Sequence, residues 1–367
     1  MLHHHRPTTS QTWFKLDTPL FLAISVLIGF GLFMLYSAGN GDWIFIKRQS
    51  LNALLAFAAM LVCAQIPPRK YRIWAPWLFS LAFMLLVIVL LVGSRSKGAE
   101  RWLNLGFFKF QPSELMKLAM PMVLAWYFRE RPLPPKIIDF GAIAVLIALP
   151  TLLVMKQPDL GTAIMIAASG CCVLLLIGIP WRYIGIACLI ALIFLPIAWH
   201  FMHTYQQQRV LTFLNPERDP LGTGYHIIQS KIAIGSGGLF GKGWMQTTQS
   251  RLHFLPEHHT DFIFAVCGES FGFIGCLFLL FAYATVLFRC VFISLNAQDT
   301  FTRILSGSLT LTFFVLMFVN MGMVTGIFPV VGIPLPLISY GGTSMVTLLI
   351  GFGMLMSIQS HRQLITT

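Results

Sequence analysis

The sequence predicts an all-α polytopic membrane protein, with about ten transmembrane helices and one large extracytoplasmic loop. Of its 367 residues, 56% are apolar and only 10% are charged, which is too little charge for a soluble domain of this size. Residues 81–92 are apolar without a break, whereas the strands of an outer-membrane barrel alternate apolar and polar side chains. We therefore expect the chain to cross the membrane as helices.

Ten apolar windows are each near the length that crosses a bilayer. They are residues 18–38, 46–66, 73–93, 113–128, 138–156, 161–180, 183–203, 261–288, 303–325 and 344–360. An even number of spans puts both termini on the same side of the membrane. We expect a single membrane domain over residues 1–367, with residues 204–260 as a large loop between helices 7 and 8.

The distribution of charge predicts the orientation. With cytoplasmic termini, the inner connections hold twelve Lys or Arg residues and the short outer connections hold eight, as the positive-inside rule favours. The large loop adds five outer cations, which are Arg209, Arg218, Lys231, Lys242 and Arg251. Two explanations stay open, because long loops escape the rule and because the outer face could bind an anion. The predicted location is the cytoplasmic (inner) membrane, with both termini inside and the site facing the periplasm.

The acidic residue in the most informative position is Asp261. It follows the polar stretch 204–260 and precedes a long apolar run, so it stands at the mouth of a membrane helix, where a carboxylate is costly. The alternative is that Asp261 complements the dipole of a helix that Thr260 caps. Glu269 lies eight residues further along, about 12 Å deeper, and needs a partner; we interpret it as structural.

A second outer motif lies at residues 111–117. Here Pro112 and Ser113 predict the start of a helix, after which Glu114 and Lys117 share one helix face. Two interpretations stay open for this pair. It neutralises itself at the end of a membrane helix, or it holds the lysine toward a phosphate.

Two further outer motifs combine glycine and proline within apolar sequence. In residues 157–162, a proline and a glycine interrupt the pattern and leave Asp159 near a helix N-terminus. Residues 332–344 form a second broken segment. Irregular backbone at membrane depth survives only where it is buried in protein or lines a cavity, so both segments are expected to border a site.

The sequence contains no pattern for ATP, a redox cofactor, haem or nucleic acid. The glycine-rich segment 235–243 has Ser236 where a P-loop needs glycine, and Gly243 where it needs Ser or Thr. The seven cysteines all lie in apolar segments without CxxC spacing. We therefore expect buried thiols and no protein metal site.

Five long motifs in order resemble the SEDS family (shape, elongation, division and sporulation proteins) almost from end to end. They lie at residues 111–117, 157–162, 215–226, 255–262 and 332–344. The glycine-rich segment, together with residues 248–250, is similar to the elongation branch rather than the division branch. One departure lies in residues 267–270, where family members often carry consecutive acids and this chain has only Glu269.

The resemblance implies a peptidoglycan glycosyltransferase that polymerises lipid II at the outer face of the membrane during cell elongation and releases undecaprenyl pyrophosphate. The implied partners are glycan linked to undecaprenyl pyrophosphate, a class B penicillin-binding protein that acts as transpeptidase, and the elongation machinery. Asp261 is implied to be the essential acid. The residues expected to bind substrate are Glu114, Lys117, Arg101, Asp159, Lys231, Lys242, Ser339 and Tyr340.

The implied chemistry agrees with one prominent carboxylate. Glycosidases use two carboxylates, partly because their leaving group must be protonated, whereas pyrophosphate leaves once its charge is stabilised. One base on the acceptor hydroxyl then suffices, and cations or a divalent metal at the pyrophosphate, Mg²⁺ or Mn²⁺, replace the acid. Two alternatives stay open: a transporter that flips lipid II, which predicts an inner-facing site and an inverted repeat, and a non-catalytic scaffold for the transpeptidase.

Overall fold

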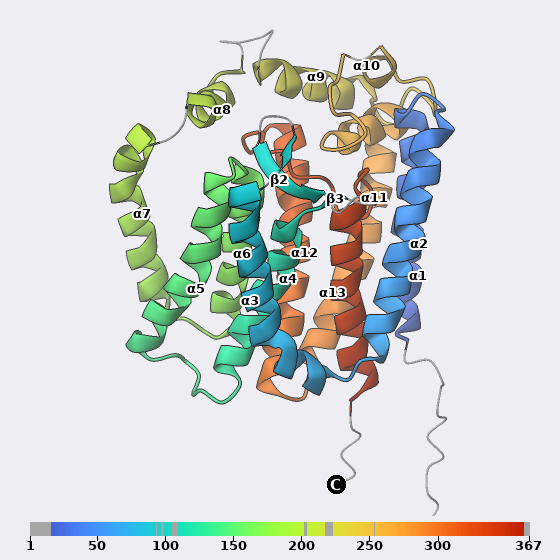
Figure 1. Ribbon diagram of the computed structural model, residues 1–367. Helices are drawn as coiled ribbons and strands as arrows, with labels where there is room; N and C mark the ends of the chain where they lie inside the picture. Colours follow the sequence, from blue (N-terminus) through green and yellow to red (C-terminus); the bar gives the residue numbers. More distant parts are fainter. Residues whose placement is uncertain are drawn as a thin grey trace, which may run out of the picture.

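The computed structural model describes residues 16–92, 94–96, 99–104, 109–201, 204–216, 223–252 and 254–362. Within them, each of the ten predicted windows corresponds to one helix. These helices are α1 (Thr18–Ala38), α2 (Trp43–Gln65), α3 (Pro68–Val92), α4 (Pro112–Phe128), α5 (Ile137–Lys156), α6 (Leu160–Leu176), α7 (Trp181–Phe201), α11 (Ile263–Leu295), α12 (Thr300–Thr325) and α13 (Gly342–Ser360). They stand side by side as a bundle, with α7 at its edge (Figure 1).

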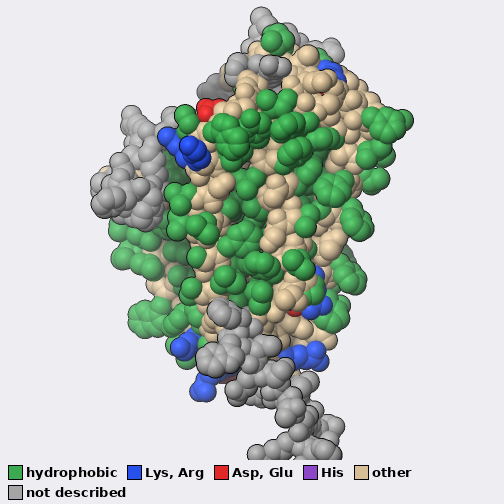
Figure 2. All heavy atoms as spheres, turned by 90° about the vertical axis from the view of Figure 1, so that its right-hand side faces the viewer, with side chains coloured by type: hydrophobic (Ala, Val, Ile, Leu, Met, Phe, Trp, Pro, Cys, Tyr) green, Lys and Arg blue, Asp and Glu red, His purple; other side chains and the backbone are tan. Residues whose placement is uncertain are grey.

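The length and apolar character of these helices suit a bilayer. Seven of the described helices are long and apolar enough to cross a membrane, namely α1, α2, α3, α5, α11, α12 and α13, and α6 is an apolar helix of 17 residues. Large hydrophobic side chains such as Leu91 and Phe288 face outward. Figure 2 shows hydrophobic side chains over most of the height of one face, with Lys and Arg toward both of its ends. The chain is a multi-pass helical membrane protein, as predicted.

The predicted loop 204–260 folds over one end of the bundle. It contains α8 (Thr204–Leu214), α9 (Thr223–Ser236) and α10 (Thr248–Arg251). These short helices lie across the top of the bundle in Figure 1, and we call this side the loop end. The start of α1 and the end of α13 both lie at the opposite end, as an even number of spans requires.

A small antiparallel sheet lies between α3 and α4, in addition to the predicted helices. Its strands are β1 (Ser94–Ser96), β2 (Ala99–Asn104) and β3 (Lys109–Phe110), in the order β1-β2-β3. Strands of two to six residues are too short for an alternating pattern to stand out in the sequence. The sheet lies at the loop end (Figure 1), close to the start of α4.

Two helices set the frame of the bundle. Of the apolar window of α12, 72% is buried, against 22% for α2, α3 and α5, so α12 is a central helix that other helices surround. The helix α11 extends beyond its predicted window, 261–288, and is broken at Gly272, which has φ 63° and ψ −155°. This break was not predicted, because glycine is common within intact membrane helices.

Candidate active site

Motifs that are far apart in the sequence meet at the loop end. The Gln111 side chain donates a hydrogen bond to the Asp159 carboxylate at 3.1 Å. The turn beside Asp159 packs on residues 331–333, because a Cβ on Gly161 would lie 2.5 Å from the carbonyl oxygen of Val331. Only glycine fits so close a contact. The two broken segments therefore pack against each other at the loop end.

Asp261 lies at the centre of this assembly, in a turn before α11, with its side chain partly exposed. Its Oδ2 atom faces Gly332, where a Cβ would lie 3.5 Å away. Gly332 has a φ of 74°, a conformation that glycine adopts at little cost. The Ser339 hydroxyl donates to the carbonyl oxygen of Thr260 at 2.5 Å. The Asp261 turn and the second broken segment are thus held against each other.

The alternative that Thr260 caps a helix beginning at Asp261 is wrong. The helix α11 begins at Ile263, with Phe262 at the N-cap position and no side-chain hydrogen bond from that residue. The Thr260 hydroxyl donates instead to Glu257 Oε2 at 2.9 Å. Thr260 therefore closes the turn that precedes Asp261, because the polypeptide turns once more before it becomes helical.

Ser339 and Tyr340, both predicted to bind substrate, are engaged inside the protein. The Ser339 hydroxyl accepts a hydrogen bond from the Leu335 backbone N–H at 2.8 Å. The Tyr340 backbone N–H donates to the His259 carbonyl oxygen at 3.0 Å, and its ring meets Phe45 edge-on at 5.6 Å. These contacts connect the broken segment 332–344 to the Asp261 turn and to α2.

His226 lies beside the same turn. Its ring stacks on Phe262, the residue after Asp261, with centroids 5.9 Å apart and planes 14° apart. Burial lowers the pKa of His226, and the charge of Arg209 lowers it further, while Glu257 acts in the opposite direction. The Nδ1 atom of His226 is buried without a hydrogen-bond partner among the described residues. The neutral imidazole is therefore favoured in the folded protein.

The Glu114–Lys117 pair predicted from its spacing is present on α4. Lys117 Nζ lies 2.7 Å from Glu114 Oε1, and the two side chains are only 11% and 8% exposed. Both residues line a cavity of about 40 Å³ between α4, α12 and α13. Glu114 Oε2 is buried without a hydrogen-bond partner in the described part of the chain, so the pair can accept one more donor.

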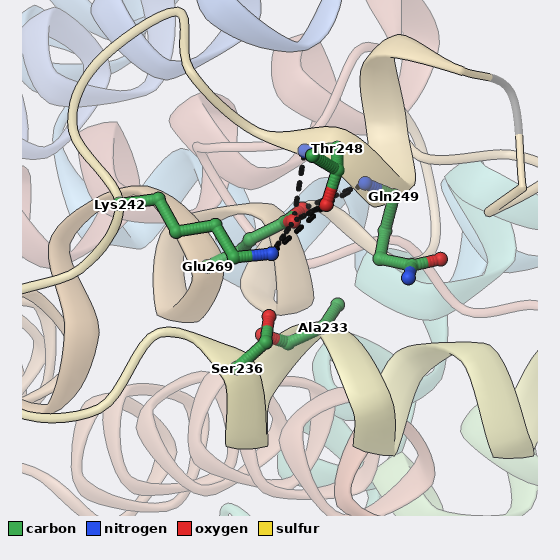
Figure 3. Close-up of polar contacts among 6 residues, drawn as sticks. All are labelled: Ala233, Ser236, Lys242, Thr248, Gln249 and Glu269. Atoms are coloured by element: carbon green, nitrogen blue, oxygen red, sulfur yellow. Dashed lines mark hydrogen bonds and ion pairs between the residues drawn. The ribbon is translucent and has the colours of Figure 1, made fainter.

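Glu269 has the partner that its depth requires. Its fully buried carboxylate accepts hydrogen bonds at Oε1 from Lys242 Nζ at 2.8 Å and from the Thr248 hydroxyl at 2.9 Å (Figure 3). The backbone N–H groups of Thr248 and Gln249 donate to the same oxygen at 2.9 and 3.1 Å. Lys242, predicted as a substrate-binding residue, is thus used in fastening the loop to α11.

The glycine-rich segment 235–243 packs on the break in α11. A Cβ on Gly237 would lie 1.9 Å from the carbonyl oxygen of Gly268, and one on Gly241 would lie 2.2 Å from that of Ser270. Four backbone hydrogen bonds, 2.9 to 3.2 Å long, join the two segments. The glycines therefore permit close backbone packing, in agreement with the absence of a P-loop pattern.

Lys231 and Arg101 complete the predicted set. The Lys231 side chain passes over Gly326 at the C-terminal end of α12, where a Cβ would lie 2.8 Å from Lys231 Nζ. A cation in this place complements the helix dipole. Arg101 lies on β2, and its side chain falls outside the part that the structure describes.

A protein metal site is not formed by the described residues. Among them, no three His, Cys, Asp or Glu side chains come together as ligands. The described residues therefore do not fit a metal centre built by the protein alone. Mg²⁺ in phosphate-transfer sites is commonly bound by one or two carboxylates together with substrate phosphates, so a Mg²⁺ ion at the described residues would also need oxygen ligands from substrate.

Two buried or partly buried amides that the sequence did not single out connect segments of the site. Gln49 on α2 donates to the Ser339 carbonyl oxygen at 3.2 Å and accepts from the Gly341 backbone N–H at 3.3 Å. Asn320 on α12 donates to the carbonyl oxygen of Asp261 at 2.9 Å. Each could have been found from the sequence as a polar amide within an apolar segment, because such a group needs a hydrogen-bond partner inside the membrane.

Comparison with known proteins decides the family. The family model for cell cycle proteins of the FtsW, RodA and SpoVE type matches residues 16–364. The chain belongs to this family. It is 50% identical over 363 residues to "Peptidoglycan glycosyltransferase MrdB" of Escherichia coli K12, which covers 98% of both chains. It is 37% identical over 362 residues to "Probable peptidoglycan glycosyltransferase FtsW" of Trichlorobacter lovleyi, covering 95% of this chain and 94% of the relative. The SEDS resemblance is confirmed.

Solved structures share the fold over nearly the whole chain. The rod shape determining protein RodA of Thermus thermophilus is 27% identical, with a TM-score of 0.73 over 96% of this chain and 99% of that chain. A chain of a peptidoglycan synthase complex, described as coordinating polymerization and crosslinking, is 29% identical with a TM-score of 0.82 over 95% of this chain.

Proposed function

We propose that this chain is a peptidoglycan glycosyltransferase of the elongation branch, which polymerises lipid II with release of undecaprenyl pyrophosphate. The observation that carries the proposal is the partly exposed carboxylate of Asp261 at the place where the motifs meet. Relatives named peptidoglycan glycosyltransferase match the chain almost end to end. The higher identity to MrdB, 50% against 37% for the FtsW relative, supports the elongation branch.

In the proposed reaction, Asp261 is the general base. Its carboxylate accepts the proton of the acceptor 4-hydroxyl while that oxygen attacks C1 of the donor sugar. The bond between C1 and the pyrophosphate oxygen breaks, and the pyrophosphate leaves with the electron pair. Because the displacement is direct, the configuration at C1 inverts. A positioned base of this kind contributes about 10²–10⁴-fold to the rate.

The charge of the leaving pyrophosphate needs stabilisation, for which we propose Lys117. Its ammonium group lies in a nearly buried position, with Glu114 as its partner, where an electrostatic interaction is stronger than in water. Asp159 supports the site by holding the N-terminus of α6, since it accepts from the Thr162 backbone N–H at 3.2 Å. Arg101, Lys231, Lys242, Ser339 and Tyr340 stay in the proposal as residues that bind substrate or shape its walls.

We also propose a divalent cation, Mg²⁺ or Mn²⁺, that the pyrophosphate oxygens would bind together with the protein. Such a cation would neutralise charge on the leaving group. Removal of divalent ions with EDTA should reduce polymerisation, and added Mg²⁺ should restore it. Full activity in EDTA would assign the whole of this charge stabilisation to the protein's cations.

The proposed partner is a class B penicillin-binding protein that acts as transpeptidase, within the elongation machinery. A structural relative that matches 95% of this chain comes from a peptidoglycan synthase complex, which supports this partner. We place the loop end in the periplasm and both termini in the cytoplasm, because lipid II presents its assembled headgroup at the outer face of the membrane.

The decisive experiment is polymerisation of lipid II by the purified protein, with and without its transpeptidase partner. Asp261→Asn should lower the rate by about 10²–10⁴-fold, while the variant still inserts and binds the partner, because the side chain keeps its size and loses only its basicity. Gln246→Ala, at an exposed loop position, is the matched control and should keep wild-type activity. More than about a tenth of the wild-type rate in Asp261→Asn would exclude this residue as the base.

A further inference from the structure

A single buried amide joins the Asp261 turn to the broken segment that faces it. Asn320 lies on α12 and is fully buried. Its Nδ2 atom donates to the carbonyl oxygen of Asp261 at 2.9 Å and to the carbonyl oxygen of Ile333 at 2.6 Å. One side chain thus connects two segments that are more than 70 residues apart in the sequence.

The chemistry of the amide fixes its orientation. A side-chain amide carries two N–H donors on its nitrogen and only acceptor sites on its oxygen. Both neighbours of Asn320 are carbonyl oxygens, so only the nitrogen can face them. Asn320 Oδ1 is buried without a hydrogen-bond partner among the described residues. A buried acceptor without a partner is unfavourable. The two hydrogen bonds that Asn320 Nδ2 donates must therefore account for an amide at this position.

The two carbonyl groups that Asn320 binds lie next to the contact between the Asp261 carboxylate and Gly332. Ile333 directly follows Gly332, and a Cβ on Gly332 would lie 3.5 Å from Asp261 Oδ2. The amide therefore sets the distance between the backbone that carries the carboxylate and the backbone that the carboxylate faces. Ser339 provides a second, separate connection through the carbonyl oxygen of Thr260.

We propose that Asn320 is a positioning residue for the glycosyl transfer. It acts on the base through the backbone of Asp261 and fixes the position of the carboxylate relative to the segment around Gly332. This inference rests on the proposed function, in which Asp261 is the base. The amide is too deeply buried to touch substrate, so it affects the chemical step and leaves substrate binding nearly unchanged.

The experiment compares Asn320→Leu with a matched control on the same helix. Leucine keeps the branched arrangement of side-chain heavy atoms and removes both donors. Ser306→Ala is the control, because Ser306 is equally buried on α12 and its hydroxyl donates only to backbone oxygens of that helix. Steady-state kinetics of lipid II polymerisation with the partner present give kcat and KM separately, and hydrogen exchange reports on residues 257–263 and 332–340.

For Asn320→Leu we expect kcat to fall roughly 10- to 100-fold, the loss that a misplaced catalytic group causes, with KM within about threefold of wild type. Exchange should accelerate in both segments and stay unchanged in α1 to α3. Asn320→Ser, which keeps one donor, should lie between the wild type and the leucine variant, and it serves as the test protein if the leucine variant does not fold. Ser306→Ala should match the wild type.

Two outcomes would overturn the inference. Wild-type kcat in the Asn320 variants, while Asp261→Asn is inactive, would show that the base needs no such connection. An equal acceleration of exchange over the whole bundle, with kcat and KM both impaired, would reduce Asn320 to a structural residue. If Asp261→Asn itself stays active, the proposed function has failed, and that result is separate from both outcomes.

Discussion

At the scale of single residues, the acids near the site are used in different ways. Glu114 and Glu269 form ion pairs with Lys117 and Lys242 inside the protein. Asp261 is partly exposed, at the place where the predicted motifs meet. The sequence predicted this acid because a carboxylate at a helix mouth is costly. It could not predict the hydrogen-bond partners of the segment around it, because these depend on how distant segments pack.

The Glu114–Lys117 pair allows a double-mutant test. We expect Lys117→Met to reduce polymerisation about tenfold more than Glu114→Gln, because only the lysine can stabilise pyrophosphate. Rates of lipid II polymerisation and thermal unfolding should be measured for both variants and for the double variant. If the pair only neutralises itself, the two single changes will be similarly harmful and the double change milder, since removing one partner leaves a buried charge alone.

His226 predicts a pH dependence of stability. Its pKa is lowered in the folded protein, chiefly by burial, so below the ordinary pKa of about 6.5 the unfolded chain binds a proton that the folded chain does not. The free energy of unfolding should therefore fall as the pH drops below that value. His226→Phe, which keeps the ring stacked on Phe262, should show a smaller loss between pH values of about 7.5 and 5.5. Thermal unfolding in detergent measures this loss of stability. An identical loss in the wild type and in His226→Phe would show that His226 is not its source.

At the scale of elements, the ten apolar windows predicted the ten helices, because a hydrophobic run of this length has few other folds in a membrane. The break at Gly272 could not be predicted. It is stabilised by the segment 235–243, whose backbone forms hydrogen bonds with residues on both sides of the break. Such pairing between distant segments cannot be inferred from the apolar composition of a helix. The small sheet was not predicted either, because its strands are too short to show an alternating pattern of apolar and polar residues.

The close packing of this segment predicts a large effect of one methyl group. A Cβ on Gly237 would lie 1.9 Å from the Gly268 carbonyl oxygen, whereas one on Gly235 meets nothing within 4 Å. Gly237→Ala should therefore lower the free energy of unfolding by about 1–3 kcal/mol. Gly235→Ala, at the end of α9, is the matched control and should be neutral or slightly stabilising. Thermal unfolding compares the two variants, and equal stability would mean that the segment does not pack as described.

At the scale of the whole molecule, the two ends of the bundle differ in how they use charge. At the opposite end, Asp17 pairs with Arg289 at 2.6 Å, and Asp139 pairs with Arg131. In both pairs the acid lies at the start of a helix, α1 for Asp17 and α5 for Asp139. Around Asp261, by contrast, broken segments from distant parts of the chain meet at one end of the bundle.

The proposed orientation gives the last prediction, on which every role above depends. A cysteine at Gln208, exposed on α8 at the loop end, should react with a membrane-impermeant maleimide in intact spheroplasts, in a variant that lacks the seven native cysteines. A cysteine at Pro132, exposed between α4 and α5 at the opposite end, should react only after lysis. The charge count supports this orientation by only twelve cations against eight, so the labelling is an independent measurement. The reverse pattern would place Asp261 on the cytoplasmic side, away from the face at which lipid II is polymerised, and would defeat the mechanism even though the motifs match the family.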